Sequence, residues 1–547
     1  MKKTTILFLF VALTYTSFQV FAQTQEQQFD ALLQETYTEG TPGVAALVYK
    51  EGTVLYRKAF GMANLELDVP MKPNNVFEIG SITKQFTAVS ILLLIEQGKL
   101  KLNDEITKYL PDFPTHNKKI TIHHLLNHTS GIKSYTSMPS FMGTAATDKT
   151  PIEIINVFKD QPMDFDPGEK WLYNNSGYII LGYIIEEISG KSYADFIQEH
   201  IFGPLEMKNS YYGSKSTIIK NRATGYSPAE NGFQNAKYLS MTLPYAAGSL
   251  MSTVDDMLLW HKAIHNNSLI SANSKALAFT NTTLNNGDLT NYGYGWQMNE
   301  ISGVLSIEHG GGIFGYVTHG VYVPSENVYV ITLTNRDGVS PQDATVKIAA
   351  IAMEKPYPEV DVSVSLSNAE LNAWVGNYEF DDQVLRTISL EDGQLYSQRE
   401  GSEKLMIYAD SATKFHFEDG LSTYAFKIED GKKVAHFKAR INESKGIGTD
   451  RKPGTEKEEI SVDTSNYDDY VGSYELVPGF AITITNKDNQ LFAQATGQQN
   501  FPIFPEAEDT FFYKVVSAQL VFERNDAGEV INVTLNQNGQ SLKGDKK

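Results

Sequence analysis

The chain contains no cysteine among its 547 residues. Without cysteine there is no disulfide bond, no catalytic thiol, no thiolate metal ligand and no lipidated cysteine. Hydrophobic residues make up 41% of the chain and charged residues 20%, as in an ordinary globular protein. If such a protein is exported, its stability has to come from its apolar core.

Basic residues are few relative to acidic ones. The chain has 46 Lys and Arg against 65 Asp and Glu, which gives a formal net charge of −19. Binding to phosphate groups requires a basic face. The balance therefore argues against a nucleic acid or an anionic membrane as partner, and otherwise indicates solubility.

Long apolar runs are missing except near the N-terminus. There, Lys2 and Lys3 precede an apolar core from Ile6 to Leu13, and Ala22 offers a small residue at a cleavage position. This pattern is typical of a bacterial export signal over residues 1–22. The run is too short to span a bilayer, although a retained membrane anchor is the alternative. We therefore expect a periplasmic or secreted protein without an integral membrane span.

Residues 23–355 predict one α+β domain. Alternating residues at 44–49 and 53–59 favour a β-hairpin near the start of the domain. Strands at 292–296 and 303–333 and a helix at 341–353 are expected at its end, and helices fill the middle. This order predicts an antiparallel sheet built from both chain ends, flanked by helices and carrying a helical subdomain.

The C-terminal part repeats itself. The segment from Leu371 to Phe380 resembles the segment from Tyr467 to Leu476 at an offset of 96 residues, and the offset persists further along. A fixed offset marks a duplicated unit. Each copy has seven or eight candidate strands, consistent with a small closed barrel. The predicted boundaries are a linker at 356–367, a first β domain at 368–452, a second linker at 453–465 and a second β domain at 466–547.

The segment around Ser81 predicts a turn that leads into a buried helix. Ser81 and Lys84 lie three residues apart on one face of the first turn, where a hydroxyl and an amine can act as nucleophile and base. The pattern S-x-x-K is weak alone, because it occurs by chance about once or twice in a chain of this length. Ser411 and Lys414 also fit it, and we interpret that second pair as a chance match.

Two further segments supply candidate partners for Ser81. The sequence Tyr173-Asn174-Asn175 precedes an apolar helix, and His309-Gly310-Gly311-Gly312 lies among predicted strands. His124 and His128 have the spacing of a helical metal pair. No third ligand accompanies them, so we predict packing or capping histidines and no metal site.

The three motifs S-x-x-K, Y-x-N and H-x-G, in this order, resemble a family of serine hydrolases that contains class C β-lactamases, D-alanyl-D-alanine carboxypeptidases, D-amino-acid peptidases and esterases. The segments Leu125–Gly131 and Ala247–Leu250 fit this family too. The C-terminal copies resemble the lipocalin-like barrels of some members.

The resemblance implies a role for each motif residue. Ser81 is the expected nucleophile, with Lys84 and Tyr173 as the proton-transfer pair. The N–H groups of Ser81 and Gly312 would form the oxyanion hole. Asn175 would bind Lys84 and the substrate amide. Further substrate-binding residues are expected at the following positions: Gly248, Ser249, His309 and Gly311.

The state of the Lys84–Tyr173 pair remains open at this point. Free lysine titrates near pH 10.4 and free tyrosine near pH 10, so neither is a ready base at neutral pH. Burial lowers the pKa of a lysine, whereas a neighbouring ammonium lowers the pKa of a tyrosine. The two groups should titrate as a coupled pair.

His309 departs from the lysine usual in β-lactamases and carboxypeptidases of this family. Histidine is largely neutral at pH 7 and attracts a substrate carboxylate less strongly. We therefore expect an acyl-enzyme hydrolase for D-amino-acid-containing peptides or related small amides, with an esterase or a β-lactamase as alternatives. A low-turnover penicillin-binding sensor is the alternative from another class.

No cofactor is expected for this chemistry. The expected partners are small peptide, ester or β-lactam substrates. For the duplicated barrels, three roles remain open: binding of an apolar ligand, self-association into a homo-oligomer, and shielding of the active site from large substrates.

Overall fold

The structure is a computed structural model. It describes residues 23–547 except for residues 139, 215, 361–362, 454–458, 478–479, 496–499, 517 and 538–539. The predicted export signal, residues 1–22, lies outside the described residues, as do parts of both predicted linkers. No helix in the described part of the chain is long and apolar enough to cross a membrane.

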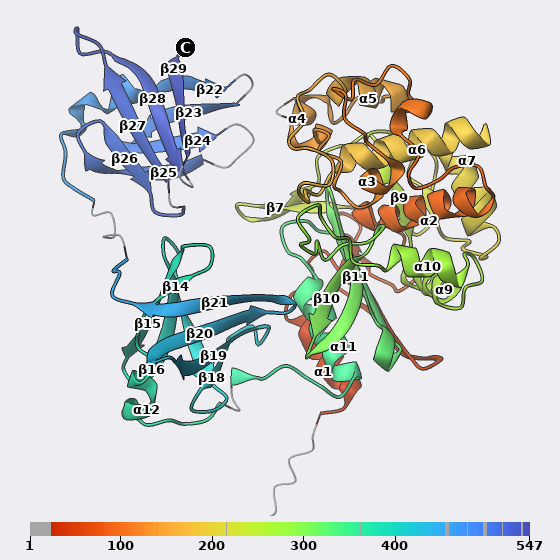
Figure 1. Ribbon diagram of the computed structural model, residues 1–547, viewed down its shortest axis with the longest axis horizontal. Helices are drawn as coiled ribbons and strands as arrows, with labels where there is room; N and C mark the ends of the chain where they lie inside the picture. Colours follow the sequence, from red (N-terminus) through yellow and green to blue (C-terminus); the bar gives the residue numbers. More distant parts are fainter. Residues whose placement is uncertain are drawn as a thin grey trace, which may run out of the picture.

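A six-stranded antiparallel sheet is the centre of the first domain (Figure 1), with the strand order β10-β11-β12-β13-β1-β2. Its strands are β1 (Val44–Lys50), β2 (Thr53–Phe60), β10 (Gln297–Ile301), β11 (Val304–Ile313), β12 (Tyr316–Val323) and β13 (Val328–Thr334). The fully buried β13 pairs with β1 on one side and with β12 on the other. The prediction of one sheet built from both chain ends is therefore confirmed.

Helices cover both faces of this sheet. On one face, α1 and α11 pack over a core that contains Val328 and Val330, and on the other face Ile331 and Leu333 join a larger core with the remaining helices. This division follows from the alternation of side chains along β13. The helices of the first domain are α1 (Gln25–Gln34), α2 (Thr83–Glu96), α3 (Ile122–Leu126), α4 (Phe141–Thr144), α5 (Pro151–Phe158), α6 (Asn175–Ser189), α7 (Tyr193–Ile197), α8 (Tyr245–Gly248), α9 (Val254–His265), α10 (Ala272–Ala278) and α11 (Gln342–Ala352).

Short strands connect the helical part to the sheet. They are β3 (Met62–Asn64), β4 (Val69–Pro70), β5 (Phe77–Glu78), β6 (Tyr211–Tyr212), β7 (Tyr226–Ala229), β8 (Gly232–Asn235) and β9 (Leu250–Ser252). The strand expected at residues 292–296 is wrong, because β10 begins only at Gln297. Gly295 has a φ of +84°, and a Cβ there would lie 2.9 Å from the Lys84 carbonyl oxygen. This segment turns against α2 instead of extending.

Two closed barrels follow, as predicted. The first, which begins with α12 (Asn368–Asn372), has the strands β14 (Gly376–Phe380), β15 (Leu385–Glu391), β16 (Gln394–Arg399), β17 (Lys404–Ala409), β18 (Lys414–Phe417), β19 (Ser422–Glu429), β20 (Lys432–Ala439) and β21 (Asn442–Thr449). The second, which begins with α13 (Tyr467–Tyr470), has the strands β22 (Gly472–Val477), β23 (Phe480–Lys487), β24 (Gln490–Ala495), β25 (Asn500–Ala507), β26 (Thr510–Tyr513), β27 (Ala518–Arg524), β28 (Val530–Gln537) and β29 (Gln540–Lys546).

The duplication extends to individual hydrogen bonds. The Tyr378 hydroxyl donates to the Trp374 carbonyl over 2.7 Å, and the Tyr474 hydroxyl donates to the Tyr470 carbonyl over the same distance. The two donors, Tyr378 and Tyr474, are 96 residues apart, and so are the two acceptors, as in the sequence repeat. The same hydrogen bond therefore occurs at equivalent positions of the two barrels.

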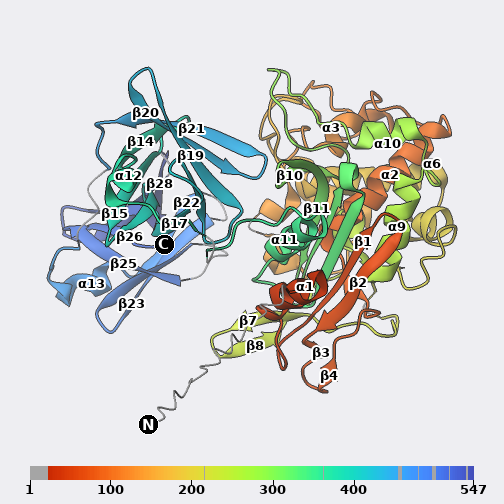
Figure 2. The ribbon, with the colours of Figure 1, turned by 90° about the horizontal axis from the view of Figure 1, so that it is seen from below.

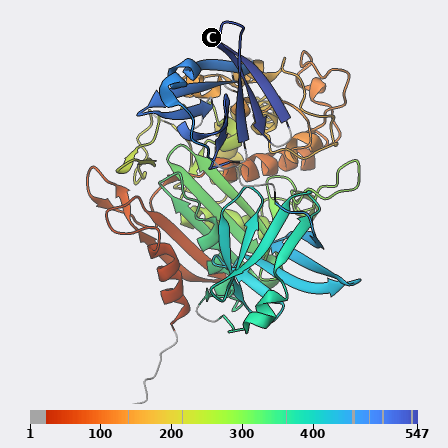
Figure 3. The ribbon, with the colours of Figure 1, turned by 90° about the vertical axis from the view of Figure 1, so that its left-hand side faces the viewer.

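Both barrels lie on the same side of the first domain (Figure 2). In Figure 3 the first barrel, coloured teal to light blue, lies in front of the first domain, and Figure 1 shows that its β20 and β21 strands reach toward β10. Its hairpin β20–β21 makes the contact: the Ile441 N–H donates to Asn299 Oδ1 over 3.2 Å, and Lys438 pairs with Glu300 over 2.9 Å. The first barrel is thus docked on the sheet of the first domain.

Candidate active site

Ser81 lies in η1 (Gly80–Ile82), one turn before α2 begins. Gly80 has a φ of +53°, which favours glycine, and a Cβ there would lie only 2.8 Å from the Gly312 nitrogen. The Ser81 turn therefore packs directly on strand β11. This close approach brings the two backbone N–H groups predicted for an oxyanion hole, those of Ser81 and Gly312, to one place.

Lys84 is completely buried beneath Ser81. Its Nζ lies 3.2 Å from Ser81 Oγ, 2.8 Å from Asn175 Oδ1 and 2.8 Å from the Ala247 carbonyl oxygen. Burial lowers the pKa of Lys84 well below its ordinary value, because the protein interior disfavours the charged form. A lysine of this kind can be neutral near pH 7 and accept a proton.

Aromatic rings enclose the lysine. The Nζ of Lys84 is 4.8 Å from the centre of the Tyr173 ring and 5.4 Å from that of Tyr178. Burial raises the pKa of Tyr173, and the nearby Ser81 hydroxyl only partly opposes this rise. The buried Tyr173 hydroxyl has no well-aligned hydrogen-bond partner among the described residues. Tyr173 is therefore a protonated, unengaged hydroxyl next to the nucleophile.

His309 is buried behind this cluster. Its Nδ1 donates to the Gly310 carbonyl over 2.6 Å, so its Nε2 accepts from the Tyr292 hydroxyl over 2.9 Å. Burial and then the charge of Lys84 lower the pKa of His309 to about 3. His309 is thus neutral, with both ring nitrogens engaged inside the protein.

The three glycines after His309 differ in the space that surrounds them. A Cβ on Gly311 would lie 2.0 Å from the Ile79 carbonyl oxygen, whereas a Cβ on Gly312 would meet nothing within 4 Å. Gly311 is needed because the Ser81 turn packs on it, and not to leave room for substrate. Strand β10 pairs with β11 only up to Glu308, so residues 309–313 form an edge that β10 does not cover.

A cavity of about 430 Å³ opens above Ser81. Its walls are largely apolar and come from helices, loops and β11: Ser81, Tyr135, Thr136, Phe141, Asn175, Leu239, Pro244, Ala247, Gly248, Gly312, Ile313, Phe314, Val317 and Asp337. Among these described lining residues Asp337 is the only acidic one, and none is Lys, Arg or His. This volume fits a small substrate with an apolar side chain.

Only some of the predicted binding residues line the cavity. Asn175, Gly248 and Gly312 line the cavity, whereas His309, Gly311 and Ser249 do not. Ser249 is fully buried and donates its hydroxyl to the Met241 carbonyl. These three residues lie behind the cavity wall, and their contact with substrate stays a prediction.

The two histidines of the helical pair have structural contacts. His124 Nδ1 accepts from the Thr121 N–H at the start of α3, and His128 Nδ1 accepts from the Asn174 N–H over 3.0 Å. Within the described ranges no group of acidic or histidine side chains could hold a metal ion. His128 therefore supports the Tyr173-Asn174-Asn175 segment.

Several residues of the candidate site lie outside the three motifs. Thr136 accepts from Asn175 Nδ2 over 2.9 Å, and the Ala247 carbonyl accepts from Lys84. Phe314 and Asp337 line the cavity from segments that follow strands. A backbone carbonyl and residues gathered from separate loops leave no fixed spacing in a single sequence.

Comparison with known proteins agrees with this geometry. A family model described as Beta-lactamase matches residues 26–353, which is more than half of the chain. The chain belongs to the beta-lactamase family. Membership in this family indicates a serine hydrolase. A second model, described as a domain of unknown function (DUF3471), matches residues 456–546 and so covers the second barrel.

The part of the chain that aligns differs from one relative to another. Penicillin-binding protein 4* of Bacillus subtilis is 31% identical over 413 residues, which cover 71% of this chain and 89% of the relative. D-aminopeptidase of Gluconobacter oxydans is 27% identical over 321 residues, which cover 58% of this chain and 60% of the relative.

Two solved structures have the same fold. The octameric penicillin-binding protein homologue from Pyrococcus abyssi is 25% identical, with a TM-score of 0.54, and the match covers 77% of this chain and 99% of that one. The D-stereospecific amidohydrolase from Streptomyces sp. is 25% identical, with a TM-score of 0.52, and the match covers 59% of this chain and 97% of that one.

Proposed function

We propose that this chain is an exported serine hydrolase that forms an acyl-enzyme on Ser81 and acts on D-amino-acid-containing peptides or related small amides and esters. The observation that carries the proposal is the contact of Lys84 with Ser81 at the base of the apolar cavity. The names of two relatives, a D-aminopeptidase and a D-stereospecific amidohydrolase, support the choice of substrate class.

In the proposed reaction, neutral Lys84 accepts the hydroxyl proton of Ser81 while Ser81 Oγ bonds to the substrate carbonyl carbon. The N–H groups of Ser81 and Gly312 stabilise the oxyanion. Tyr173, protonated because burial raises its pKa, gives its proton to the leaving amine or alcohol, and Lys84 returns a proton to Tyr173. A water molecule then hydrolyses the ester on Ser81 by the same groups in reverse.

A panel of four compounds tests the substrate class. It compares hydrolysis of a D-alanyl anilide, p-nitrophenyl acetate, nitrocefin and a D-Ala-D-Ala peptide by the purified protein. We expect the anilide and the acetate to be turned over, since the cavity wall has no cation to hold the carboxylate of the other two compounds. A stable acyl adduct with no turnover of any compound would instead indicate a penicillin-binding sensor.

Asp337 gives a prediction about selectivity. Its Oδ2 accepts from the Gly315 N–H and the Ser227 hydroxyl, each over 2.8 Å, so the carboxylate is held in place at the cavity wall. Asp337→Asn is expected to lower kcat/KM for a D-amino-acid anilide with a free α-ammonium about tenfold, as for loss of a charge-assisted hydrogen bond of about 1.5 kcal/mol.

The N-acetylated anilide is the matched control, because it has no ammonium to lose an interaction. Its kcat/KM should stay within about twofold of the wild-type value. An equal loss for both anilides would show that Asp337 acts on the fold of the 315–337 region and not on the substrate.

Tyr173→Phe tests the proton donor. The substitution removes a hydroxyl that has no other well-aligned partner, so the fold should be unchanged. We expect kcat for the anilide to fall at least about tenfold, at the low end for loss of a general acid. The loss should be smaller for p-nitrophenyl acetate, whose leaving group needs no proton. Unchanged rates for both compounds would exclude this role.

A further inference from the structure

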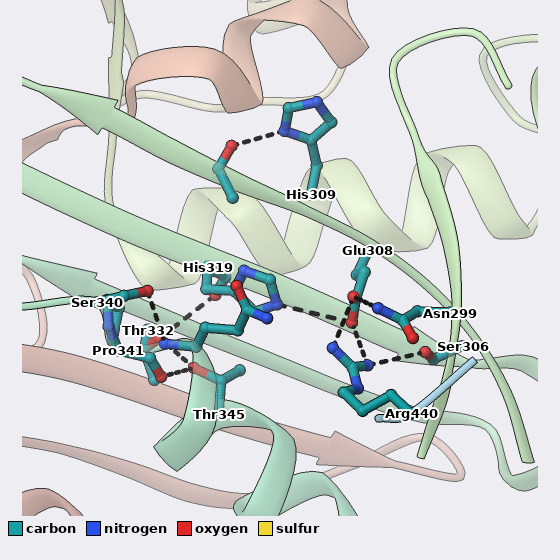
Figure 4. Close-up of polar contacts among 12 residues, drawn as sticks. Asn299, Ser306, Glu308, His309, His319, Thr332, Ser340, Pro341, Thr345 and Arg440 are labelled. Carbon is teal, nitrogen blue, oxygen red and sulfur yellow. Dashed lines mark hydrogen bonds and ion pairs between the residues drawn. The ribbon is translucent and has the colours of Figure 1, made fainter. Parts of the chain in front are cut away.

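An arginine of the first barrel reaches into the first domain beside the active-site strand. Arg440 lies at the turn between β20 and β21, and its guanidinium binds both oxygens of Glu308 on β11, over 2.8 and 2.7 Å (Figure 4). The side chains are 8% and 1% exposed. Two further hydrogen bonds of Arg440 go to the Glu300 carbonyl over 2.9 Å and to the Ser306 hydroxyl over 3.3 Å.

Side chains from two strands and one barrel turn surround Glu308. Asn299 Nδ2 on β10 donates to its Oε1 over 2.8 Å, and His319 Nε2 on β12 lies 3.7 Å from its Oε2. Burial alone would raise the pKa of Glu308, but His319 and Arg440 outweigh it and lower the pKa to about 2. Glu308 is therefore a buried carboxylate at all working pH values, and Arg440 is its permanently charged partner.

The Arg440–Glu308 pair and the candidate active site lie on opposite faces of strand β11. Glu308 and Gly310 face the side of the sheet that carries α11, and His309 faces the active site (Figure 4). The His319 ring lies over Gly310, where a Cβ would be 3.3 Å from its Nδ1. On the other face, Gly311 packs against Ile79 in the Ser81 turn.

Gly312 is four residues from Glu308, which is about 13 Å along a strand. Because β10 does not pair with residues 309–313, this half of β11 has one strand neighbour, β12. Glu308 is thus the last residue of β11 that pairs with β10 before the oxyanion nitrogen, and beyond it the Tyr292 hydroxyl holds the His309 side chain. A shift of β11 at Glu308 would be passed on to Gly312 through the backbone.

We propose that Arg440 is a positioning residue for the hydrolase reaction: by binding Glu308, the first barrel holds the strand that carries the Gly312 N–H in its catalytic register. The first barrel is then part of the catalytic unit and not a separate appendage. This inference rests on Ser81 as the nucleophile. It agrees with the extent of the match to penicillin-binding protein 4*, which spans more of this chain than the hydrolase domain alone.

The test is the rate at which a fluorophosphonate labels Ser81 of the full chain. In this reaction the Ser81 Oγ–phosphorus bond forms and fluoride leaves, so the rate reports the nucleophile and the oxyanion hole without a known substrate. Arg440→Met is expected to lower the second-order labelling rate at least about tenfold at pH 8. Lys438→Met is the matched control on the same hairpin, because its pair with Glu300 is more exposed, and its rate should stay within about twofold of the wild-type rate.

A pH series separates positioning from a merely structural role. Loss of Arg440 removes one of the two groups that lower the pKa of Glu308, whereas burial continues to raise that pKa. The Glu308 carboxyl of Arg440→Met should take up a proton more readily as the pH falls, and this removes the unpaired buried charge. The ratio of the Arg440→Met rate to the wild-type rate should therefore rise as the pH falls from 8 to 5. In Glu308→Gln/Arg440→Met no charge remains to be paired, so the ratio should stay constant across this range and lie above that of Arg440→Met at pH 8.

The outcomes are distinct. The positioning role would be overturned if Arg440→Met were labelled at the wild-type rate. It would also be overturned if the variant had a lower melting temperature but an unchanged labelling rate and pH profile. Absence of labelling in the wild type would instead overturn the nucleophile. If Arg440→Met does not fold, Arg440→Lys keeps the charge but loses the two-pronged contact, and it should label more slowly than Lys438→Met.

Discussion

Ser81→Ala is expected to abolish covalent labelling by a fluorophosphonate and to lower kcat for any hydrolysed anilide or ester by at least about 10⁴-fold. The reason is that, among the described residues, Ser81 has the hydroxyl that contacts Lys84 Nζ and lines the cavity together with Gly312. The Ser81 turn packs so closely on β11 that its backbone, not its side chain, determines the local fold. The variant should therefore have the melting temperature of the wild type. Intact-mass measurement after labelling gives the readout.

The chain contains a matched control for this experiment. Ser411 has the same S-x-x-K spacing to Lys414, but its hydroxyl accepts from the N–H groups of Thr413 and Lys414 in an exposed turn. Ser411→Ala should be labelled and active like the wild type. Labelling that persists in Ser81→Ala, or disappears in Ser411→Ala, would show that the nucleophile is assigned to the wrong residue.

The sequence was sufficient for the fold class, because it contained periodic signals for each part. The alternation at residues 44–59 and 303–333 predicted a sheet joined from both chain ends, and the repeat of 96 residues predicted two equal β domains. Both features are confirmed. The error at residues 292–296 arose since aromatic residues favour strands, whereas the close approach of Gly295 to Lys84 depends on tertiary structure.

The arrangement of the candidate catalytic residues was predictable from the motifs, but their electrostatics were not. Ser81, Lys84 and Asn175 come together as expected. The motif left open whether lysine or tyrosine loses its proton more easily, because that depends on how completely each is buried. The rings of Tyr173 and Tyr178 lie on the Lys84 side chain, and only the fold shows that Lys84 is completely buried.

The contact between the first barrel and the first domain had no signal in the sequence. Arg440 was an ordinary basic residue of the predicted first β domain, and Glu308 was one acidic residue beside a motif. Their spacing of 132 residues follows from how the barrel docks, so neither composition nor periodicity could pair them. The same holds for Asp337, which lines the cavity from the segment after β13.

Lys84→Met is expected to lower kcat by about 10⁴-fold, near the upper limit for loss of a general base. Methionine has a similar length and no charge, and it fits among the aromatic rings that enclose the site. Lys84→Arg should be equally inactive, because a guanidinium does not lose its proton in the working range. Lys414→Met, in the chance motif, is the matched control and should keep full activity.

The pH dependence of the wild type gives the sign of the Lys84 effect. Because burial lowers the pKa of Lys84, the neutral base is present only above this lowered value, so kcat/KM should rise with pH through it. In the unfolded chain the lysine titrates near pH 10.4 and binds a proton that the folded chain lacks. Between the lowered pKa and about pH 10 the free energy of unfolding should therefore rise with pH, by up to about 1.4 kcal/mol per unit.

Chemical unfolding of the wild type and Lys84→Met at several pH values isolates this contribution. The stability of the wild type relative to Lys84→Met should increase from pH 7 to pH 9, since every other titrating group is common to both proteins. A difference that is constant with pH would mean that Lys84 stays protonated in the folded protein. Lys84 would then hold the tyrosinate form of Tyr173 by its charge, and the base would be Tyr173 in spite of the burial that raises its pKa.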